Sequence, residues 1–121
     1  MEVSNYQKLI VWQKAMELTV GIFKLAEKLP KKEIYALSNQ MRRAAVSIPS
    51  NIAEGHGRRY PREFVRFLLI ARGSRAELET QLQLCVKVGY LTNADITETS
   101  KLISEIGKML NTLIKRVDGS K

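Results

Sequence analysis

The chain offers few of the residues on which catalysis and metal binding depend. It contains one histidine, His56, and one cysteine, Cys85. Metal centres built from these residues need several ligands at short spacing, so the sequence indicates no metal site. A serine–histidine–acid triad would have to use His56, and no nucleophile motif accompanies it. We therefore expect a protein that is not an enzyme and that carries no cofactor.

The low contents of cysteine, proline and glycine limit which cellular compartment and which fold class we expect. Cys85 has no second cysteine to pair with, which is typical of proteins from a reducing cytoplasm. Three prolines and seven glycines favour helices, in a chain whose length suits one domain, residues 1–121. The polar start, residues 1–8, lacks the order of a signal peptide. No apolar run approaches the ~18 residues that a membrane span requires.

Apolar residues recur every three or four positions in four stretches, which is typical of amphipathic helices. We expect helices at about 9–29, 33–55, 61–88 and 96–117, joined by short links. Short links make neighbouring helices antiparallel, so the sequence predicts an all-α, antiparallel up-down-up-down four-helix bundle. The predicted buried stripe of the first helix is Trp12, Met16, Thr19, Phe23, Ala26 and Leu29, with Ile22 alongside. Those of the second and third are Ile34, Leu37, Met41, Ala44, Ile48 and Ile52, and Phe64, Leu68, Ala71, Arg75, Leu78, Leu82 and Cys85.

Three local signals concern where these helices bend or end. Pro49 removes a donor and crowds the carbonyl of Ala45, so we expect a kink at 47–50 or a break that Ser50 or Asn51 caps. Gly89 is well suited to end the third helix. Thr92 and Asp95 resemble an N-terminal capping pair for the fourth.

The last two stretches contain more apolar residues than a narrow stripe needs. The additional residues are Leu69, Ile70 and Leu84 in the third, and Ile103, Leu110 and Ile114 in the fourth. Excess apolar surface usually marks a protein interface, so self-association is one hypothesis. The alternative is a broad buried face.

The formal net charge is +8, and arginine is concentrated in one part of the chain. Eight of the nine arginines lie between Arg42 and Arg75, a window that contains no lysine and only Glu54 and Glu63 as acidic residues. The guanidinium fork matches phosphate or carboxylate oxygens, so the pattern indicates a polyanionic partner. The alternative is a basic surface that serves only solubility.

The candidate nucleic-acid-binding residues are Arg58, Arg59, Arg62 and Arg66, with Arg42 and Arg43 as a second group. Aromatic residues are sparse among them and no DNA-binding motif occurs, so we expect contact with the RNA or DNA backbone. Local ion pairs in a solvated turn are the alternative for the first group. We expect Arg75 to be structural, with Glu79 or a carboxylate on another helix or subunit as its partner.

Two other functions remain open at this stage. The basic surface could dock an acidic protein partner, which would make the chain a protein-interaction scaffold that ignores nucleic acid. Glu54 and His56 could form an acid–base pair for phosphodiester cleavage, although capping and loop hydrogen bonds are commoner roles for such groups.

Two sequence blocks resemble a known family. Residues 40–55, QMRRAAVSIPSNIAEG, and residues 67–74, FLLIARGS, followed by Glu77-Leu78, are similar to the hallmarks of the bacterial 23S rRNA intervening-sequence proteins. The opening LIVWQKA at 9–15 and Leu29-Pro30 also fit. The resemblance implies a four-helix bundle that assembles into a ring, a homopentamer. The family is similar to the accessory protein of diversity-generating retroelements, which implies nucleic acid, a reverse transcriptase or a ribosomal component as partners.

Overall fold

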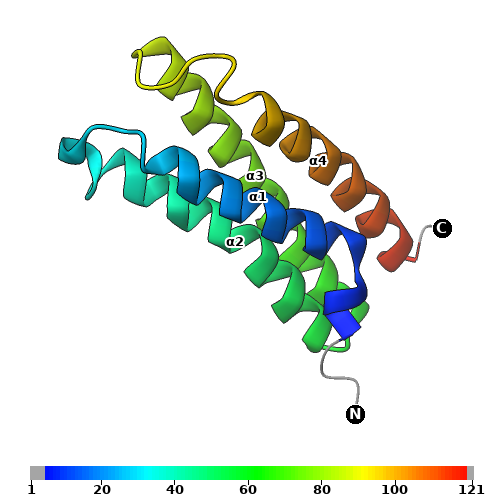
Figure 1. Cartoon of the computed structure of the whole chain (residues 1–121). Coiled ribbons are helices and arrows are strands. Elements are labelled where there is room, and N and C mark those ends of the chain that lie inside the picture. Colours follow the sequence, from blue (N-terminus) through cyan, green and yellow to red (C-terminus); the bar gives the residue numbers. More distant parts are fainter. Residues whose placement is uncertain (1–4, 120–121) are drawn as a thin grey trace.

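The four expected helices form an antiparallel bundle in the computed structural model, which describes residues 5–119 (Figure 1). The helices are α1 (Ile10–Ala26), α2 (Leu37–Gly57), α3 (Pro61–Lys87) and α4 (Thr97–Val117), with short 3-10 turns η1 (Asn5–Lys8) and η2 (Lys31–Glu33). No strand occurs among the described residues, so the all-α fold is confirmed. None of these helices has the length and hydrophobicity that a bilayer span requires.

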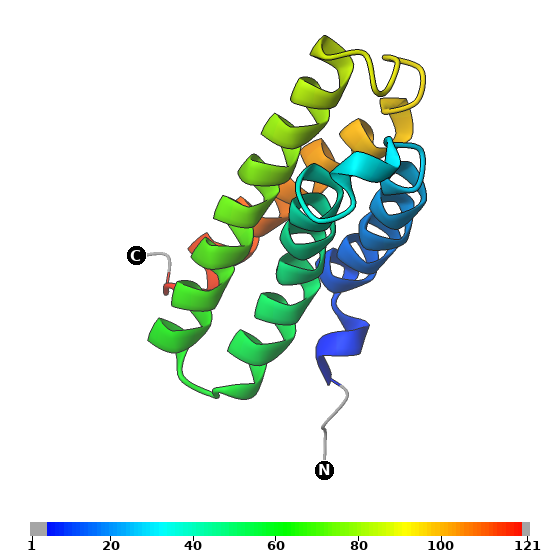
Figure 2. The same ribbon diagram turned by 90° about the vertical axis from the view of Figure 1, so that its left-hand side faces the viewer.

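Successive helices run in opposite directions, and this gives the bundle two different ends (Figures 1 and 2). The terminal end holds η1, the α2–α3 turn at 58–60 and the last turn of α4. The loop end holds the connections 27–36 and 88–96, which are longer than the short links expected from the sequence. Each helix packs on its chain neighbours, and α1 also packs on α4, which closes the bundle.

The core lies where the four helices face one another. Its largest fully buried side chains are Leu18, Ile22, Met41, Ile48, Ile52, Leu68, Leu78, Leu82, Ile103, Ile106, Leu110 and Cys85. Burying an aliphatic side chain of this size contributes about 1.5–3 kcal/mol, so this set accounts for most of the driving force. The predicted stripes of α2 and α3 are confirmed apart from Ile34, which is exposed, and Arg75. Burial raises the pKa of the Cys85 thiol, as suits a packing residue.

The predicted stripe of α1 is only partly correct. Ile22, Ala26 and Leu29 are buried as expected, but at Met16 and Phe23 the helix turns a neighbouring face to the core. Met16 and Phe23 are 42% and 40% exposed, whereas Ala15, Leu18 and Ile22 are fully buried. Apolar residues cover more than half of this helix, so two overlapping stripes fit the spacing. Contact with α2 decides between them, since Thr19 lies at the α1–α2 boundary and donates a hydrogen bond to a carbonyl of α2.

Helix α2 continues through Pro49, so the expected break with a Ser50 or Asn51 cap is wrong. Proline leaves the carbonyl four residues earlier without its usual donor. That carbonyl belongs to Ala45, and it accepts a hydrogen bond of 3.1 Å from the Thr19 hydroxyl of α1. The same hydroxyl also lies 2.8 Å from the carbonyl of Ala15 in its own helix, so two acceptors share its single proton. Packing against α1 thus offers the Ala45 carbonyl a donor where Pro49 has none.

The end of α3 is a Schellman motif, as Gly89 predicts. Gly89 has a φ of +87°, a conformation that costs glycine little. The N–H of Tyr90 donates to the carbonyl of Cys85 at 2.9 Å, and the N–H of Gly89 donates to Val86 at 3.1 Å. These two bonds satisfy carbonyls that the helix end would otherwise leave free.

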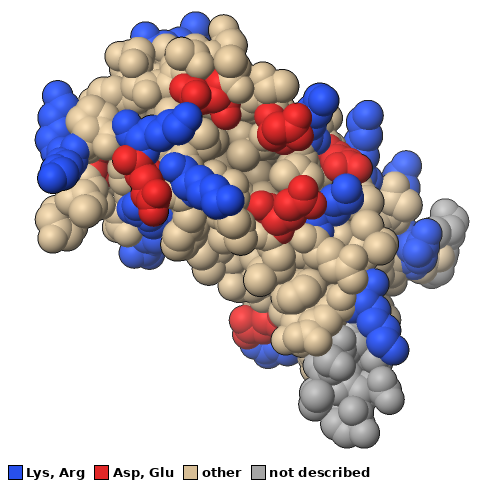
Figure 3. Space-filling view, viewed as in Figure 1, with Lys and Arg blue, Asp and Glu red and all other residues tan. Residues whose placement is uncertain are grey.

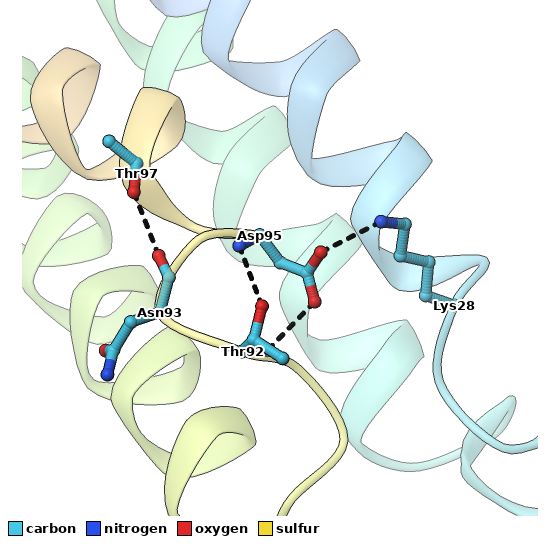
Figure 4. Close-up of polar contacts among 5 residues, drawn as sticks. All are labelled: Lys28, Thr92, Asn93, Asp95 and Thr97. Atoms are coloured by element: carbon cyan, nitrogen blue, oxygen red, sulfur yellow. Dashed lines mark hydrogen bonds and ion pairs between the residues drawn. The ribbon is translucent and has the colours of Figure 1, made fainter.

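The Thr92–Asp95 pair forms the reciprocal bonds of a capping box (Figure 4). The Thr92 N–H donates to the Asp95 carboxylate at 2.8 Å, and the Asp95 N–H donates to the Thr92 hydroxyl at 3.1 Å. The pair closes the turn that precedes α4 and, contrary to expectation, does not cap that helix, because α4 begins at Thr97 and its N-cap, Ile96, has no side-chain cap. Lys28 also binds Asp95 at 3.0 Å and joins the two connections of the loop end. The hydrogen bond from the Thr92 N–H lowers the pKa of Asp95, and the hydrogen bond from Lys28 lowers it further.

Candidate nucleic-acid interface

The α2–α3 turn presents four arginines at the terminal end. Arg59 adopts a φ of +72°, the left-handed conformation, which reverses the chain between two helices. Pro61 then occupies the first position of α3, where its missing N–H costs nothing. We call Arg58, Arg59, Arg62 and Arg66 the turn arginines, and all four are exposed. The structure thus brings together the first group of candidates.

Two of the turn arginines lie against the ring of Phe67. The guanidinium carbons of Arg58 and Arg66 are 5.0 and 4.6 Å from its centroid. Arg58 also binds Glu54 at 2.9 Å, and Arg66 binds Glu63 at 3.1 Å. Such exposed contacts contribute at most about 1 kcal/mol each, so a polyanion can displace the carboxylates. The arginine side chains stay 47% and 56% exposed, which leaves donors available.

The electrostatics of Glu63 reflect this arrangement. The hydrogen bond from Arg66, with the positive charges of Arg66 and Arg58, lowers the pKa of Glu63. Glu63 is therefore ionised at neutral pH and competes with any phosphate for Arg66.

The other two turn arginines have no such competitor. Within residues 5–119, the side chains of Arg59 and Arg62 make no hydrogen bond or ion pair. The neighbouring Tyr60 is 70% exposed and is the aromatic side chain of this turn. Arg62 and Arg66 are four residues apart on one face of α3, a spacing at which like charges repel slightly and an anion between them is favoured.

The second group of candidates lies elsewhere. Arg42 and Arg43 are about 23 Å from Arg58 along the axis of α2, at 1.5 Å per residue. The Arg42 guanidinium stacks over Phe23 of α1 at 5.7 Å, and Arg43 is exposed. Both line a shallow depression with Val46, Ser47 and Ser50. The six predicted residues therefore form two separate surfaces.

The remaining arginines of the window join α3 to α4. Arg72 donates to the Asn111 side chain at 3.0 Å. Arg75 donates to the carbonyl of Ile103 at 3.4 Å and lies 3.8 Å from Glu79, which confirms its structural contacts. A Cβ at Gly107 would lie 3.0 Å from the Arg75 guanidinium, so glycine leaves the space that this side chain occupies.

The structure does not assemble the proposed acid–base pair. His56 packs edge-on against Phe64, with ring centroids 5.5 Å apart, and Glu54 binds Arg58. Residues two apart on a helix point in different directions, which separates the two groups. No group of three or more His, Cys, Asp or Glu residues that could hold a metal occurs in the described part of the chain.

Sequence reasoning missed three cations that line a groove. Lys8, Lys108 and Arg116 surround a volume of about 490 Å³ between the start of α1 and the second half of α4, with Lys108 near the middle of that helix. The antiparallel topology could have predicted this, since it places the start of α1 and the end of α4 at the same end of the bundle as the α2–α3 turn. Figure 3 shows mixed charges over the face of α1 and α4, and mostly basic side chains beside the termini.

Comparisons with known proteins agree with the fold. Residues 7–112 match the profile described as 23S rRNA-intervening sequence protein. The chain is also similar to a crystal structure of a protein of unknown function from the S23 ribosomal protein family of Bacteroides thetaiotaomicron. That match has a TM-score of 0.80 and 29% identity, and it covers 87% of this chain and 98% of the other. No curated protein matches.

Proposed function

The chain belongs to the 23S rRNA-intervening sequence protein family, and from that membership we propose that it is a non-enzymatic homo-oligomer that binds the backbone of RNA or DNA through the turn arginines. The observation that carries the proposal is the exposure of all four guanidinium groups at one end of the bundle, where only Glu54 and Glu63 of the described residues oppose them. Arg59 and Arg62 form no ion pair within that same part of the chain, so they give up no carboxylate on binding.

The chemistry of this surface favours phosphate over bases. Tyr60 is the exposed aromatic ring at the turn, whereas single-strand stacking platforms present several. Arginine–phosphate contacts need only the backbone, so we expect weak sequence preference. We propose that it acts in the bacterial cytoplasm, with ribosomal RNA or a reverse-transcriptase complex as the target, which is what the resemblance of the hallmark blocks implies.

The first test is the salt dependence of RNA binding. Each phosphate contacted contributes about 0.7–0.9 to the slope of log affinity against log salt concentration. Replacing Arg62 and Arg66 with alanine should flatten the slope by about 1.5 if each contacts one phosphate. The measurement is fluorescence anisotropy with a labelled ribosomal RNA fragment across a salt series.

The matched control replaces Lys31 and Lys32, two exposed lysines of η2 at the loop end, with alanine. This variant loses the same two positive charges, and its slope of log affinity against log salt concentration should equal that of the unmodified protein. If both double variants flattened the slope equally, the effect would come from net charge and not from contacts of Arg62 and Arg66. No binding at physiological salt would contradict the proposal and favour the acidic-protein alternative.

A second prediction concerns Glu63 as a competitor of phosphate. A phosphate that takes Arg66 removes the hydrogen bond that lowers the pKa of Glu63, so this pKa rises on binding. Binding then takes up protons, and affinity should increase as the pH falls through the Glu63 range. Replacing Glu63 with glutamine should tighten RNA binding about 1.5- to 5-fold at pH 7 and reduce this pH dependence.

The control for that prediction is Glu98→Gln, which removes an exposed carboxylate in the first turn of α4 at the loop end. Its affinity should match that of the unmodified protein. A Glu63→Gln variant that binds no better than Glu98→Gln would show that Arg66 does not contact the nucleic acid.

Self-association is the second part of the proposal. Leu69, Ile70 and Leu84 are 42%, 41% and 46% exposed on α3, as the excess of apolar residues predicts. On α4 the excess is instead mostly buried, since Ile103 and Leu110 are inaccessible and Ile114 is partly buried against the core. We propose that copies of the chain cover the α3 residues in a homo-oligomer, a pentamer by family resemblance. Mass photometry of the purified protein tests this, and a monomer would contradict it.

A further inference from the structure

The groove at the terminal end has two chemically distinct parts. Its floor is apolar and includes Ile10, Met109 and Leu113, with Ile10 54% exposed. Three cations, Lys8, Lys108 and Arg116, stand around this floor, and none of the described residues that line it is acidic. Within residues 5–119, the side chains of these three cations make no hydrogen bond or ion pair. The groove therefore combines exposed apolar surface with uncompensated positive charge.

The spacing of the cations limits what could fill the groove. Lys108 and Arg116 are eight residues apart on α4, which separates them by about 12 Å along the helix axis. This spacing matches a polymer whose anionic groups lie two helical turns apart better than a single carboxylate or phosphate group, which would have to draw the two long side chains together. The charges of such a polymer would face both ends of the groove.

The apolar floor decides which polymer fits. Nucleic acid would use the cations but would leave Ile10, Met109 and Leu113 against water, and the described lining includes no aromatic side chain for a base to stack on. An amphipathic helix inserts an apolar stripe into such a floor and presents polar residues at both flanks. Acidic flanks would complement the three cations.

We propose that the groove between the start of α1 and the end of α4 binds an amphipathic helix of another protein, with an apolar stripe flanked by acidic residues about two turns apart. The partner's leucine-type side chains pack on Ile10, Met109 and Leu113, and its carboxylates pair with Lys108 and Arg116. This site is distinct from the turn arginines and does not depend on the proposed nucleic-acid binding.

The test uses the full-length protein and a fluorescein-labelled synthetic helix of about 15 residues, long enough to span the groove. The peptide carries leucines at i, i+3, i+4 and i+7, with glutamates two turns apart on the flank. Anisotropy at physiological salt should show saturable binding. The Lys108→Glu, Arg116→Glu double variant should raise Kd by at least about tenfold, and Ile10→Ser should raise it severalfold.

The matched control is the Lys87→Glu, Lys101→Glu double variant, which makes the same charge change at exposed lysines outside the groove. It should bind the peptide as the unmodified protein does, as should Arg62→Ala with Arg66→Ala. A peptide in which lysines replace the glutamates should not bind. Circular dichroism confirms that each variant is folded.

Several results would overturn the proposal. The first is that the acidic peptide shows no saturable binding, and the second is that the control variant loses as much peptide affinity as the Lys108→Glu, Arg116→Glu variant. The third is that the Lys108→Glu, Arg116→Glu variant loses more RNA affinity than the charge-matched control, which would assign the groove to nucleic acid. A change in oligomeric state in that variant would assign the groove to a contact between copies of the chain.

Discussion

Replacing Gly55 with alanine is expected to destabilise the protein by about 1–3 kcal/mol, although alanine is the better helix former. Gly55 is buried in the last turn of α2, where α3 approaches closely. A Cβ there would lie 2.6 Å from the Cβ of Phe67 and 3.0 Å from a ring carbon of Phe64. The helices must separate to admit the methyl group. Urea denaturation at fixed protein concentration measures the loss.

Gly73→Ala is the matched control, because Gly73 lies in α3 and a Cβ there meets nothing within 4 Å. This substitution should stabilise an isolated subunit by up to about 1 kcal/mol through helix propensity. Weaker self-association of the same variant would indicate that another copy approaches α3 at Gly73. A stability gain for Gly55→Ala would refute the close contact between α2 and α3.

The Gly55 contact also bears on the candidate site. Phe67 carries the guanidinium groups of Arg58 and Arg66 on its ring, so moving Phe67 shifts two of the turn arginines. Gly55→Ala should therefore weaken RNA binding even at temperatures where the variant is folded. Gly55, the last residue of the hallmark block, thus fixes the position of Phe67, on whose ring two of the turn arginines lie.

The sequence predicted the buried face of a helix correctly where the apolar spacing allowed only one such face. In α2 and α3 one stripe satisfies the spacing, and Ile48, Ile52, Leu78 and Leu82 are buried as expected. In α1 two stripes fit, and the choice rests on contact with α2. Such contacts join residues far apart in the sequence, which local spacing does not reveal.

In the candidate site, too, contacts within one helix could be predicted from the sequence, whereas contacts between helices could not. The pairs Arg58–Glu54 and Arg75–Glu79 are four residues apart, so their spacing predicts them. The contact of Arg72 with Asn111 and the space that Gly107 leaves for Arg75 involve a different helix. The sequence therefore predicted the concentration of arginines and the structural role of Arg75, but it could not identify the contacts that Arg72 and Arg75 make with α4.

The last prediction concerns the proline within α2. Thr19→Val should destabilise the protein by about 1–3 kcal/mol, since it leaves the Ala45 carbonyl without a donor between two packed helices. Valine and threonine are nearly the same size and have similar helix propensities, so lost packing contributes little. Thr80→Val is the control, because Thr80 donates to the carbonyl four residues earlier on its own exposed helix face. It should change stability by less than about 0.5 kcal/mol.

A double-mutant cycle with Pro49→Ala isolates the cause. Alanine at position 49 restores an N–H that can donate to Ala45 within α2, so the carbonyl no longer needs Thr19. The cost of Thr19→Val should then fall by at least about 1 kcal/mol relative to its cost beside Pro49. Equal costs in the two backgrounds would mean that Thr19 acts through its other bond, to the carbonyl of Ala15, and that Pro49 is tolerated for a different reason. A smaller cost in the Pro49→Ala background would instead identify α1 as the element that keeps α2 continuous, and with it the position of the turn arginines at the terminal end.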